Sequence, residues 1–243
     1  MNRKYDAVIF DLFGTLVDNI LPDQYHACLA ETARVLLLDR KAFITCWVDE
    51  VFRGQRRTGV FPSSAAQIEH VCARFGIPPD PAMVEEAVQA QYRYFGLPSL
   101  APRDDVPETL ATLRRAGYRI GLISDCSWEV PELWEQTALA ALIDVPIFSC
   151  AAGARKPDPR LYALALERLA VPPTRCLYVG DGSGLELTGA RTAGMDAVLI
   201  CMPHERDFVM QQSDPQHWQG QVIERIAEIL ALPGIAEDAD ALH

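Results

Sequence analysis

The strongest constraint on the fold is a series of short apolar runs separated by helix-like stretches. The first run extends from Tyr5 to Phe10 and ends at Asp11. Such a run is typical of a buried parallel strand, because helices cover both faces of a parallel sheet. Similar runs recur downstream, at Tyr118 to Ser124, Val145 to Ser149, Cys176 to Gly180 and Ala197 to Ile200. The alternation predicts a doubly wound sheet whose ligands bind beyond the carboxyl ends of the strands.

Helix signals fit this alternation. Pro107 is suited to a first helical turn, and Gly117 follows the end of the same apolar stripe. Asp158 is placed to cap the start of another helix, with Pro159 in its first turn. We therefore predict an α/β protein with a mainly parallel, Rossmann-like sheet core.

About a hundred residues separate the first two predicted strands. This is far beyond the usual two to six residues of a loop between a strand and a helix, so the stretch must carry structure of its own. Its pattern is helical at Tyr25 to Leu38, Lys41 to Phe52, Ala65 to Phe75 and Pro81 to Phe95. We predict a helical cap domain over 18–100, a discontinuous core domain over 1–17 and 101–235, and a disordered tail over 236–243.

The composition argues against several classes of protein. The formal net charge of -11 disfavours a nucleic-acid partner, because neutralising phosphates requires clustered Lys and Arg. No apolar run reaches the roughly 18 residues that span a bilayer, and the N-terminus does not resemble a cleaved signal segment. The seven cysteines occur singly, without a C-x-x-C pair. We expect a cytoplasmic protein with reduced thiols, no membrane partner, and a monomeric or homodimeric state.

Four short motifs lie at strand ends or in the adjoining loops. They are DLFGTL starting at Asp11, LISD ending in Ser124 and Asp125, RKPDP containing Lys156, and VGDGSGLEL containing Asp181 and Glu186. Each is weak alone, but together and in this order they resemble the motifs of the haloacid dehalogenase superfamily. The resemblance covers the core from residue 6 to about 200, and a helical cap after the first strand matches one type in that family. It implies a hydrolase.

The resemblance gives the first three motifs catalytic roles. Asp11 would be the nucleophile, exposed where Gly14 lets the chain turn. Thr15 and Ser124 would donate hydroxyl hydrogen bonds to the transferring group, and Lys156 would neutralise its charge. A structural turn Asp and a solvated Lys are the alternatives, which the companion motifs disfavour.

The fourth motif suggests a magnesium site. Asp181 and Glu186 would lie near Asp11 at the carboxyl edge of the sheet, and carboxylates with water and phosphate suit Mg²⁺. The family completes the set with the main-chain carbonyl two residues after the nucleophile, here that of Phe13. Glu186 is expected to bind through water, and its alternative is an exposed Glu in the first turn of a helix.

Phe13 departs from the pattern of the superfamily's phosphatases, which have an Asp there to protonate the leaving group. A phenyl ring cannot do this work, which is typically worth about 10² to 10⁴ in rate. Asp125 offers a substitute proton, although an Asp after a strand more often caps the next helix, here beginning near Ser127. Efficient phosphatase action is thus in question.

An aromatic residue at this position also occurs in the superfamily's metal-independent haloacid dehalogenases. Those enzymes replace the acidic pair of the fourth motif with small polar residues, whereas this chain keeps Asp181 and Glu186. Without a cation, carboxylates so close to Asp11 would raise one another's pKa. A magnesium-dependent reaction is therefore the preferred hypothesis.

Substrate contacts are expected from both predicted domains. Phe13, Gly14 and Asp125 lie beside the nucleophile in the motifs. The dehalogenases grip a substrate carboxylate with a cap arginine directly after a Trp, whereas here Val48 follows Trp47. The cap does offer three arginines, of which we assign the last two to an anionic substrate tail: Arg53, Arg56 and Arg57. A solvated helix end is the alternative for them.

Three functions remain open. The first is a magnesium-dependent phosphatase of a small anionic metabolite, acting through an aspartyl-phosphate. The second is a metal-independent dehalogenase or related C–X hydrolase. The third is a non-catalytic anion-binding module, which Phe13 would permit.

Overall fold

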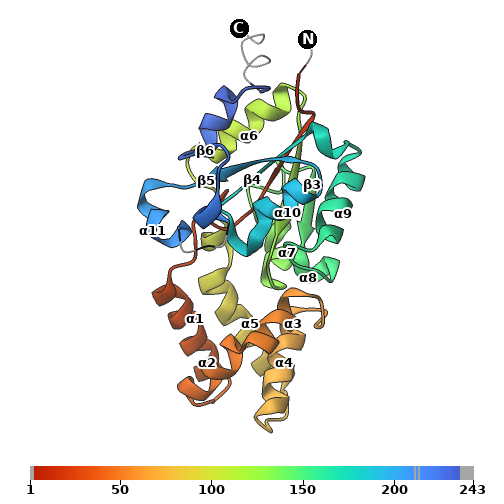
Figure 1. The fold of residues 1–243 in the computed structure, drawn as a ribbon. Coiled ribbons are helices and arrows are strands. Elements are labelled where there is room, and N and C mark those ends of the chain that lie inside the picture. Colours follow the sequence, from red (N-terminus) through yellow and green to blue (C-terminus); the bar gives the residue numbers. More distant parts are fainter. Residues whose placement is uncertain (1–2, 211, 213, 236–243) are drawn as a thin grey trace.

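The computed structural model describes residues 3–210, 212 and 214–235. A six-stranded sheet lies at its centre, with every neighbouring pair of strands parallel. The strand order is β3-β2-β1-β4-β5-β6. The strands are β1 Ala7–Phe10, β2 Arg119–Ser124, β3 Val145–Phe148, β4 Cys176–Gly180, β5 Asp196–Ile200 and β6 Val222–Ile223. The predicted doubly wound, mainly parallel α/β fold is confirmed (Figure 1).

Alternate side chains of β1 lie on opposite faces of the sheet. Val8 and Phe10 belong to one hydrophobic cluster, and Ala7 and Ile9 belong to another. All four side chains are fully buried, which is why the strand reads as a continuous apolar run. Each face is covered by helices, so the sheet presents its strand ends rather than its faces to ligands.

The helices of this part of the chain follow the sequence signals. Helix α6 (Val106–Arg115) packs Leu110 into the first cluster, and α9 (Pro159–Leu169) packs Leu161 into the second. Asp158 caps α9 by accepting the backbone N–H of Arg160 at 2.9 Å, as predicted. The remaining α-helices are α7 Glu129–Leu133, α8 Ser149–Ala152, α10 Glu186–Thr192 and α11 Arg206–Val209.

Besides α6, five α-helices lie between β1 and β2 in the chain. They are α1 Pro22–Val35, α2 Arg40–Val48, α3 Glu50–Arg57, α4 Ser64–Arg74 and α5 Pro81–Phe95. We call them the inserted helices; they gather at one end of the molecule, below the sheet in Figure 1. They share a hydrophobic cluster of their own, which includes Leu29, Phe43, Phe52 and Ile68. The domain boundaries set out above stay a prediction.

Two local expectations differ from the structure, and one short strand had no counterpart among them. The helical stretch over 41–52 is divided, because Asp49 accepts the backbone N–H of Phe52 at 3.0 Å and starts α3. Asp125 does not cap a helix near Ser127; α7 begins later, after Trp128. Strand β6 had not been expected, since two residues carry no periodicity.

The predicted tail over 236–243 lies outside the described residues. Within the described ranges, no helix is both long and apolar enough to cross a membrane.

Candidate active site

The sheet brings three of the motif residues to one edge. Phe10 of β1 pairs with Leu122 of β2 and with Val179 of β4. Asp11, Ser124 and Asp181 each lie at or just beyond the carboxyl end of one of these neighbouring strands. Parallel pairing in this register therefore places them side by side.

Lys156 joins the third motif to the first and the fourth. Its Nζ donates hydrogen bonds to Asp11 Oδ1 and to Glu186 Oε2, the latter at 2.5 Å. All three side chains are at least 95% buried. The loop that carries Lys156 is fixed by Asp125, whose Oδ1 accepts the Lys156 backbone N–H at 3.0 Å. This is the role the structure gives Asp125 in place of the expected helix cap.

Burial and mutual charge control the protonation of this group. Burial raises the pKa of Asp11 to about 6; the Lys156 ammonium opposes the rise and the Asp181 carboxylate adds to it. Burial, with the charge of Asp11, also raises the pKa of Glu186 well above its ordinary value. Burial disfavours the Lys156 ammonium, but Asp11, Glu186 and Asp125 together hold its pKa well above its ordinary value. The surrounding carboxylates therefore favour the positively charged form of Lys156 beside the predicted nucleophile.

Glu186 is held on several sides. Its Oε2 also accepts the hydroxyl of Tyr178 at 2.9 Å, and its Oε1 accepts the backbone N–H of Gly182 at 2.9 Å. A Cβ on Gly180 would lie 2.2 Å from Oε1, so β4 must end in glycine for this carboxylate to fit. Glu186 is thus fully buried rather than exposed in a first helical turn.

Two buried hydroxyls beside the nucleophile have no partner. Thr15 Oγ1 and Ser124 Oγ make no hydrogen bond within the described part of the chain. An unpaired buried hydroxyl costs about 1 to 3 kcal/mol, and a bound group that accepts their hydrogen bonds would recover this cost. The role of both hydroxyls as donors to a transferring group stays a prediction.

A cavity of about 550 Å³ lies at this edge of the sheet. Asp11, Lys156 and Asp181 line it from the core, with Phe13, Asp125, Glu129, Arg155 and Leu185. Arg57 lines it from α3, so the cavity lies between the core and the inserted helices. Neither Arg57 nor Arg155 forms a side-chain hydrogen bond or ion pair within the described residues, which leaves both guanidinium groups available to an anion.

Arg56 is placed differently from Arg57. It is buried, stacks over the Trp47 ring at 4.3 Å, and donates to the Trp47 carbonyl at 3.1 Å. It also donates to Ser127 Oγ at 3.3 Å, which joins α3 to the core. These contacts engage its two terminal nitrogens, whereas its predicted role in substrate binding stays a prediction.

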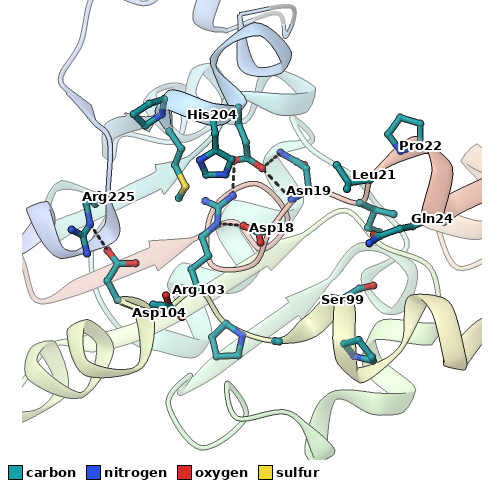
Figure 2. A pocket seen from close by; sticks show the side chains of 18 of the residues that line it. Asp18, Asn19, Leu21, Pro22, Gln24, Ser99, Arg103, Asp104, His204 and Arg225 are labelled. Carbon is teal, nitrogen blue, oxygen red and sulfur yellow. Dashed lines mark hydrogen bonds and ion pairs between the residues drawn. The ribbon is translucent and has the colours of Figure 1, made fainter.

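A larger cavity of about 1160 Å³ lies where the inserted helices join the core (Figure 2). Arg103 is its central side chain, donating to the carbonyls of Gly14 and Thr15 at 3.0 Å and to Asp18 and Glu205. Asp11 and Lys156 do not line this cavity. We therefore take the smaller cavity as the candidate active site, and Arg103 as a support for the loop after the nucleophile.

The donor set fits a divalent cation. Carboxylate oxygens of Asp11, Asp181 and Glu186 all lie within 4.8 Å of one another, and all three side chains are buried. Among the described residues, the Lys156 ammonium alone is hydrogen-bonded to this group, through Asp11 and Glu186, so the three carboxylates have an excess of negative charge that a hard cation would offset. The part played by the Phe13 carbonyl stays a prediction.

Sequence reasoning missed several contributors. The sequence does contain a hint of the role of Tyr178, because a tyrosine hydroxyl within a buried strand requires a hydrogen-bond partner. A weaker hint exists for Arg103, which is a lone arginine in a Pro-rich segment. The sequence contains no hint for Glu129 and Arg155, since their place at the cavity follows from how α7 and the Lys156 loop pack.

The sequence is similar to those of known hydrolases. A family model of haloacid dehalogenase-like hydrolases matches residues 5–194. Phosphoglycolate phosphatase of Xanthomonas campestris pv. campestris is 29% identical over 224 residues, covering 89% of this chain and 90% of that protein. Glyceraldehyde 3-phosphate phosphatase of Methanopyrus kandleri is 31% identical over 144 residues, covering 58% of this chain. The match spans 60% of that relative's length.

Solved structures share the fold. A HAD phosphatase from Thermococcus onnurineus has a TM-score of 0.65 and 23% identity, covering 93% of this chain and 96% of the other. L-2-haloacid dehalogenase from Xanthobacter autotrophicus, with chloropropionic acid covalently bound, has a TM-score of 0.61 and 20% identity. That match covers 94% of this chain and 98% of the other. One architecture therefore accommodates both of the enzyme activities considered above.

Proposed function

Because the chain belongs to the haloacid dehalogenase-like hydrolases, we propose that it is a magnesium-dependent phosphatase of a small anionic metabolite. The observation that carries the proposal is the Lys156 ammonium held between Asp11 and Glu186, with Asp181 close by. This arrangement combines a nucleophilic carboxylate with the positive charge that a transferring phosphoryl group requires. The names of the relatives, phosphoglycolate phosphatase and glyceraldehyde 3-phosphate phosphatase, support it.

The proposed reaction has two displacements at phosphorus. An Asp11 carboxylate oxygen attacks the phosphorus, the bond from phosphorus to the alcohol oxygen breaks, and an aspartyl-phosphate forms. Water then attacks the same phosphorus, which releases phosphate and restores the Asp11 carboxylate. Thr15 and Ser124 donate their free hydroxyl hydrogens to the phosphoryl oxygens, and Lys156 neutralises charge on Asp11 and on those oxygens.

Asp11, Asp181 and the Phe13 carbonyl would hold the magnesium ion, with Glu186 acting through water. When bound, the ion would supply positive charge to the phosphoryl oxygens, as divalent cations do in phosphoryl transfer. The burial of all three carboxylates, which disfavours leaving their charges uncompensated, supports this assignment.

Arg57 and Arg155 favour a substrate with a second anionic group. They line the cavity from α3 and from the Lys156 loop without partners of their own. Arg57→Ala should raise KM for an ester with a carboxylate or second phosphate more than for one with a neutral alcohol. Arg53→Ala is the matched control, because Arg53 lies on the same helix but pairs with Glu50 outside the cavity.

The second candidate is a metal-independent C–X hydrolase. Phe13 favours it, since this residue lines the cavity at the position in the chain where a phosphatase of this family has a carboxyl group. The retained carboxylates of Asp181 and Glu186 count against it, because a carbon-centred displacement by Asp11 gains nothing from two further negative charges.

One experiment separates these functions. Phosphate release is measured over a panel of small phosphomonoesters, with Mg²⁺ and with excess chelator, alongside halide release from 2-chloropropionate. Magnesium-dependent phosphate release that Asp11→Asn abolishes would support the proposal. Halide release that survives chelation would replace it with the second candidate. Anion binding without either turnover would indicate a non-catalytic module.

A further inference from the structure

Phe13 leaves the proposed reaction without a proton donor at the expected position, but the cavity contains other carboxyl groups. Four of the described residues that line it carry one: Asp11, Asp125, Glu129 and Asp181. Asp11 is the proposed nucleophile, and Asp181 belongs to the proposed cation site. Asp125 is engaged in holding the backbone of Lys156. Glu129 is the lining carboxyl group that none of these tasks occupies.

Glu129 is positioned for a different task. It is the first residue of α7, which lies at the end of the core facing the inserted helices (Figure 1). No hydrogen bond or ion pair joins its side chain to another described residue, whereas Glu132 on the same helix accepts from the Ser64 backbone N–H at 3.1 Å and from the Tyr92 hydroxyl. Glu132 thus makes one of the contacts between core and inserted helices, and Glu129 lines the cavity.

The surroundings of Glu129 favour its protonated form. Burial raises the pKa of its carboxyl group above the ordinary value, although the positive charges of Arg56 and Arg57 oppose the rise. A phosphate ester entering the cavity would bring further negative charge, which acts in the same direction as burial. A raised pKa moves a carboxyl group toward the range in which a general acid is effective.

We propose that Glu129 is the proton donor and acceptor of this active site, a role that rests on the phosphatase function proposed above. In the first step its carboxyl proton passes to the alcohol oxygen as the bond from phosphorus to that oxygen breaks, and Glu129 becomes a carboxylate. In the second step this carboxylate takes a proton from the water that attacks the aspartyl-phosphate. Glu129 is then protonated again, the Asp11 carboxylate is restored, and inorganic phosphate leaves.

The test compares two classes of leaving group in the native enzyme and in Glu129→Gln. Alkyl phosphates such as glycerol 2-phosphate need protonation on departure, whereas p-nitrophenyl phosphate does not. We expect Glu129→Gln to lower kcat/KM for the alkyl ester by about 10² to 10⁴, and for the aryl ester by less than about tenfold. Equal losses for both esters, or no loss, would overturn the assignment of Glu129 while leaving the phosphatase function in place.

Glu132→Gln is the matched control. It removes a carboxylate one turn along the same helix, at the contact with the inserted helices, and should lower the melting temperature without changing the ratio of alkyl to aryl turnover. The same change in that ratio would show that Glu129 acts through this contact rather than by proton transfer.

If Glu129→Gln does not fold, the proposal is tested on the native enzyme by measuring kcat/KM for a series of esters with different leaving groups. A weak dependence of kcat/KM on leaving-group pKa supports the donor, and a steep one overturns it. Absence of turnover of both esters in the native enzyme would overturn both proposals.

Discussion

A Cβ on Gly14 would lie 2.5 Å from Asp181 Oδ2. Gly14 also has φ +77°, a backbone conformation that L side chains rarely adopt. The loop after the nucleophile therefore approaches the fourth motif as closely as it does because residue 14 has no side chain. This contact links the position of Asp11 to the position of the proposed cation site.

Gly14→Ala should consequently damage the site more than the fold. The left-handed conformation costs about 1 to 2 kcal/mol for alanine, and the methyl group would displace the Asp181 carboxylate. We expect kcat/KM for phosphate release to fall at least about a hundredfold, since a misplacement of about 1 Å can have that effect. The melting temperature should fall by a few degrees.

Gly54→Ala is the control for this substitution. Gly54 lies within α3, and a Cβ there would meet nothing within 4 Å. Alanine favours a helix over glycine by up to about 1 kcal/mol, so this variant should keep its activity and melt slightly higher. Comparable losses of activity in both variants would show that the contact between Gly14 and Asp181 is not what matters.

Magnesium should raise the melting temperature. An ion that binds the folded state alone stabilises it by about 2.7 kcal/mol at a concentration a hundred times its Kd, which corresponds to about 5 to 10 °C for a chain of this length. Asp181→Asn should abolish this shift and should raise the melting temperature in chelator, because it removes a buried negative charge. Differential scanning fluorimetry with and without Mg²⁺ provides the measurement.

A second cluster of possible metal ligands provides a control for the magnesium prediction. Asp18, His204 and Glu205 also bring possible ligand atoms within 4.8 Å of one another, although Arg103 already pairs with both carboxylates. Asp18→Asn should therefore leave the magnesium shift intact. Loss of the shift in Asp18→Asn with retention in Asp181→Asn would place the ion at this other cluster.

Asp11→Asn should abolish turnover and preserve the fold. The amide retains the size of the carboxylate but lacks its nucleophilic oxygen. Removing one of three neighbouring carboxylates should also lower the repulsion within the site, so we expect a melting temperature in chelator at or above that of the native protein. Residual turnover above about 10⁻³ of native in a folded variant would rule out Asp11 as nucleophile.

Much of this site was predictable because the motif residues follow apolar runs. Asp11, Ser124 and Asp181 lie at parallel strand ends, and parallel strands of one sheet present these ends along a single edge. Lys156 was predictable because the helix start at Asp158 fixes its position in the chain. At each of these positions, the local sequence pattern and the topology of the sheet predict the same location for the residue.

The contributions of Tyr178, Arg103 and Glu129 depend on long-range packing instead. Arg103 reaches back across the sequence to the carbonyl groups of Gly14 and Thr15, and no local pattern specifies such a contact. The expected helix cap at Asp125 was wrong for the same reason, since Asp125 Oδ1 instead accepts the backbone N–H of Lys156, whereas its predicted contact with substrate stays a prediction. Side chains that bond to distant backbone groups are those that sequence patterns predict least well.

Stability at acid pH should depend on Asp6. Arg175, and to a lesser extent Arg3, hold the pKa of Asp6 at about 2, below its ordinary value of about 3.8. A pKa lowered by folding contributes stability above the ordinary value and loses it as the pH falls to the folded value. Asp6→Asn should therefore lower the free energy of unfolding at pH 7 by up to about 1 kcal/mol, because the pair is partly exposed. The difference in melting temperature from native should shrink between pH 4 and pH 2, and a difference independent of pH would exclude the ion pair as its cause.

The last prediction concerns Phe13 and Glu129 together. If Glu129 already supplies the proton, Phe13→Asp in the native background adds a second donor and should change alkyl phosphate turnover by less than about tenfold. In the Glu129→Gln background, the same substitution restores a carboxyl group where the family's phosphatases keep one. It should then recover much of the roughly 10² to 10⁴-fold loss of kcat/KM for alkyl esters, with little change for p-nitrophenyl phosphate.

The recovery of kcat/KM is limited by how well a carboxyl group fits a position occupied by a phenyl ring. A large gain in the native background would instead show that no proton donor acts there. Loss of all activity in both backgrounds, with the fold retained, would show that the reaction requires the ring itself, and C–X hydrolysis would become the better account.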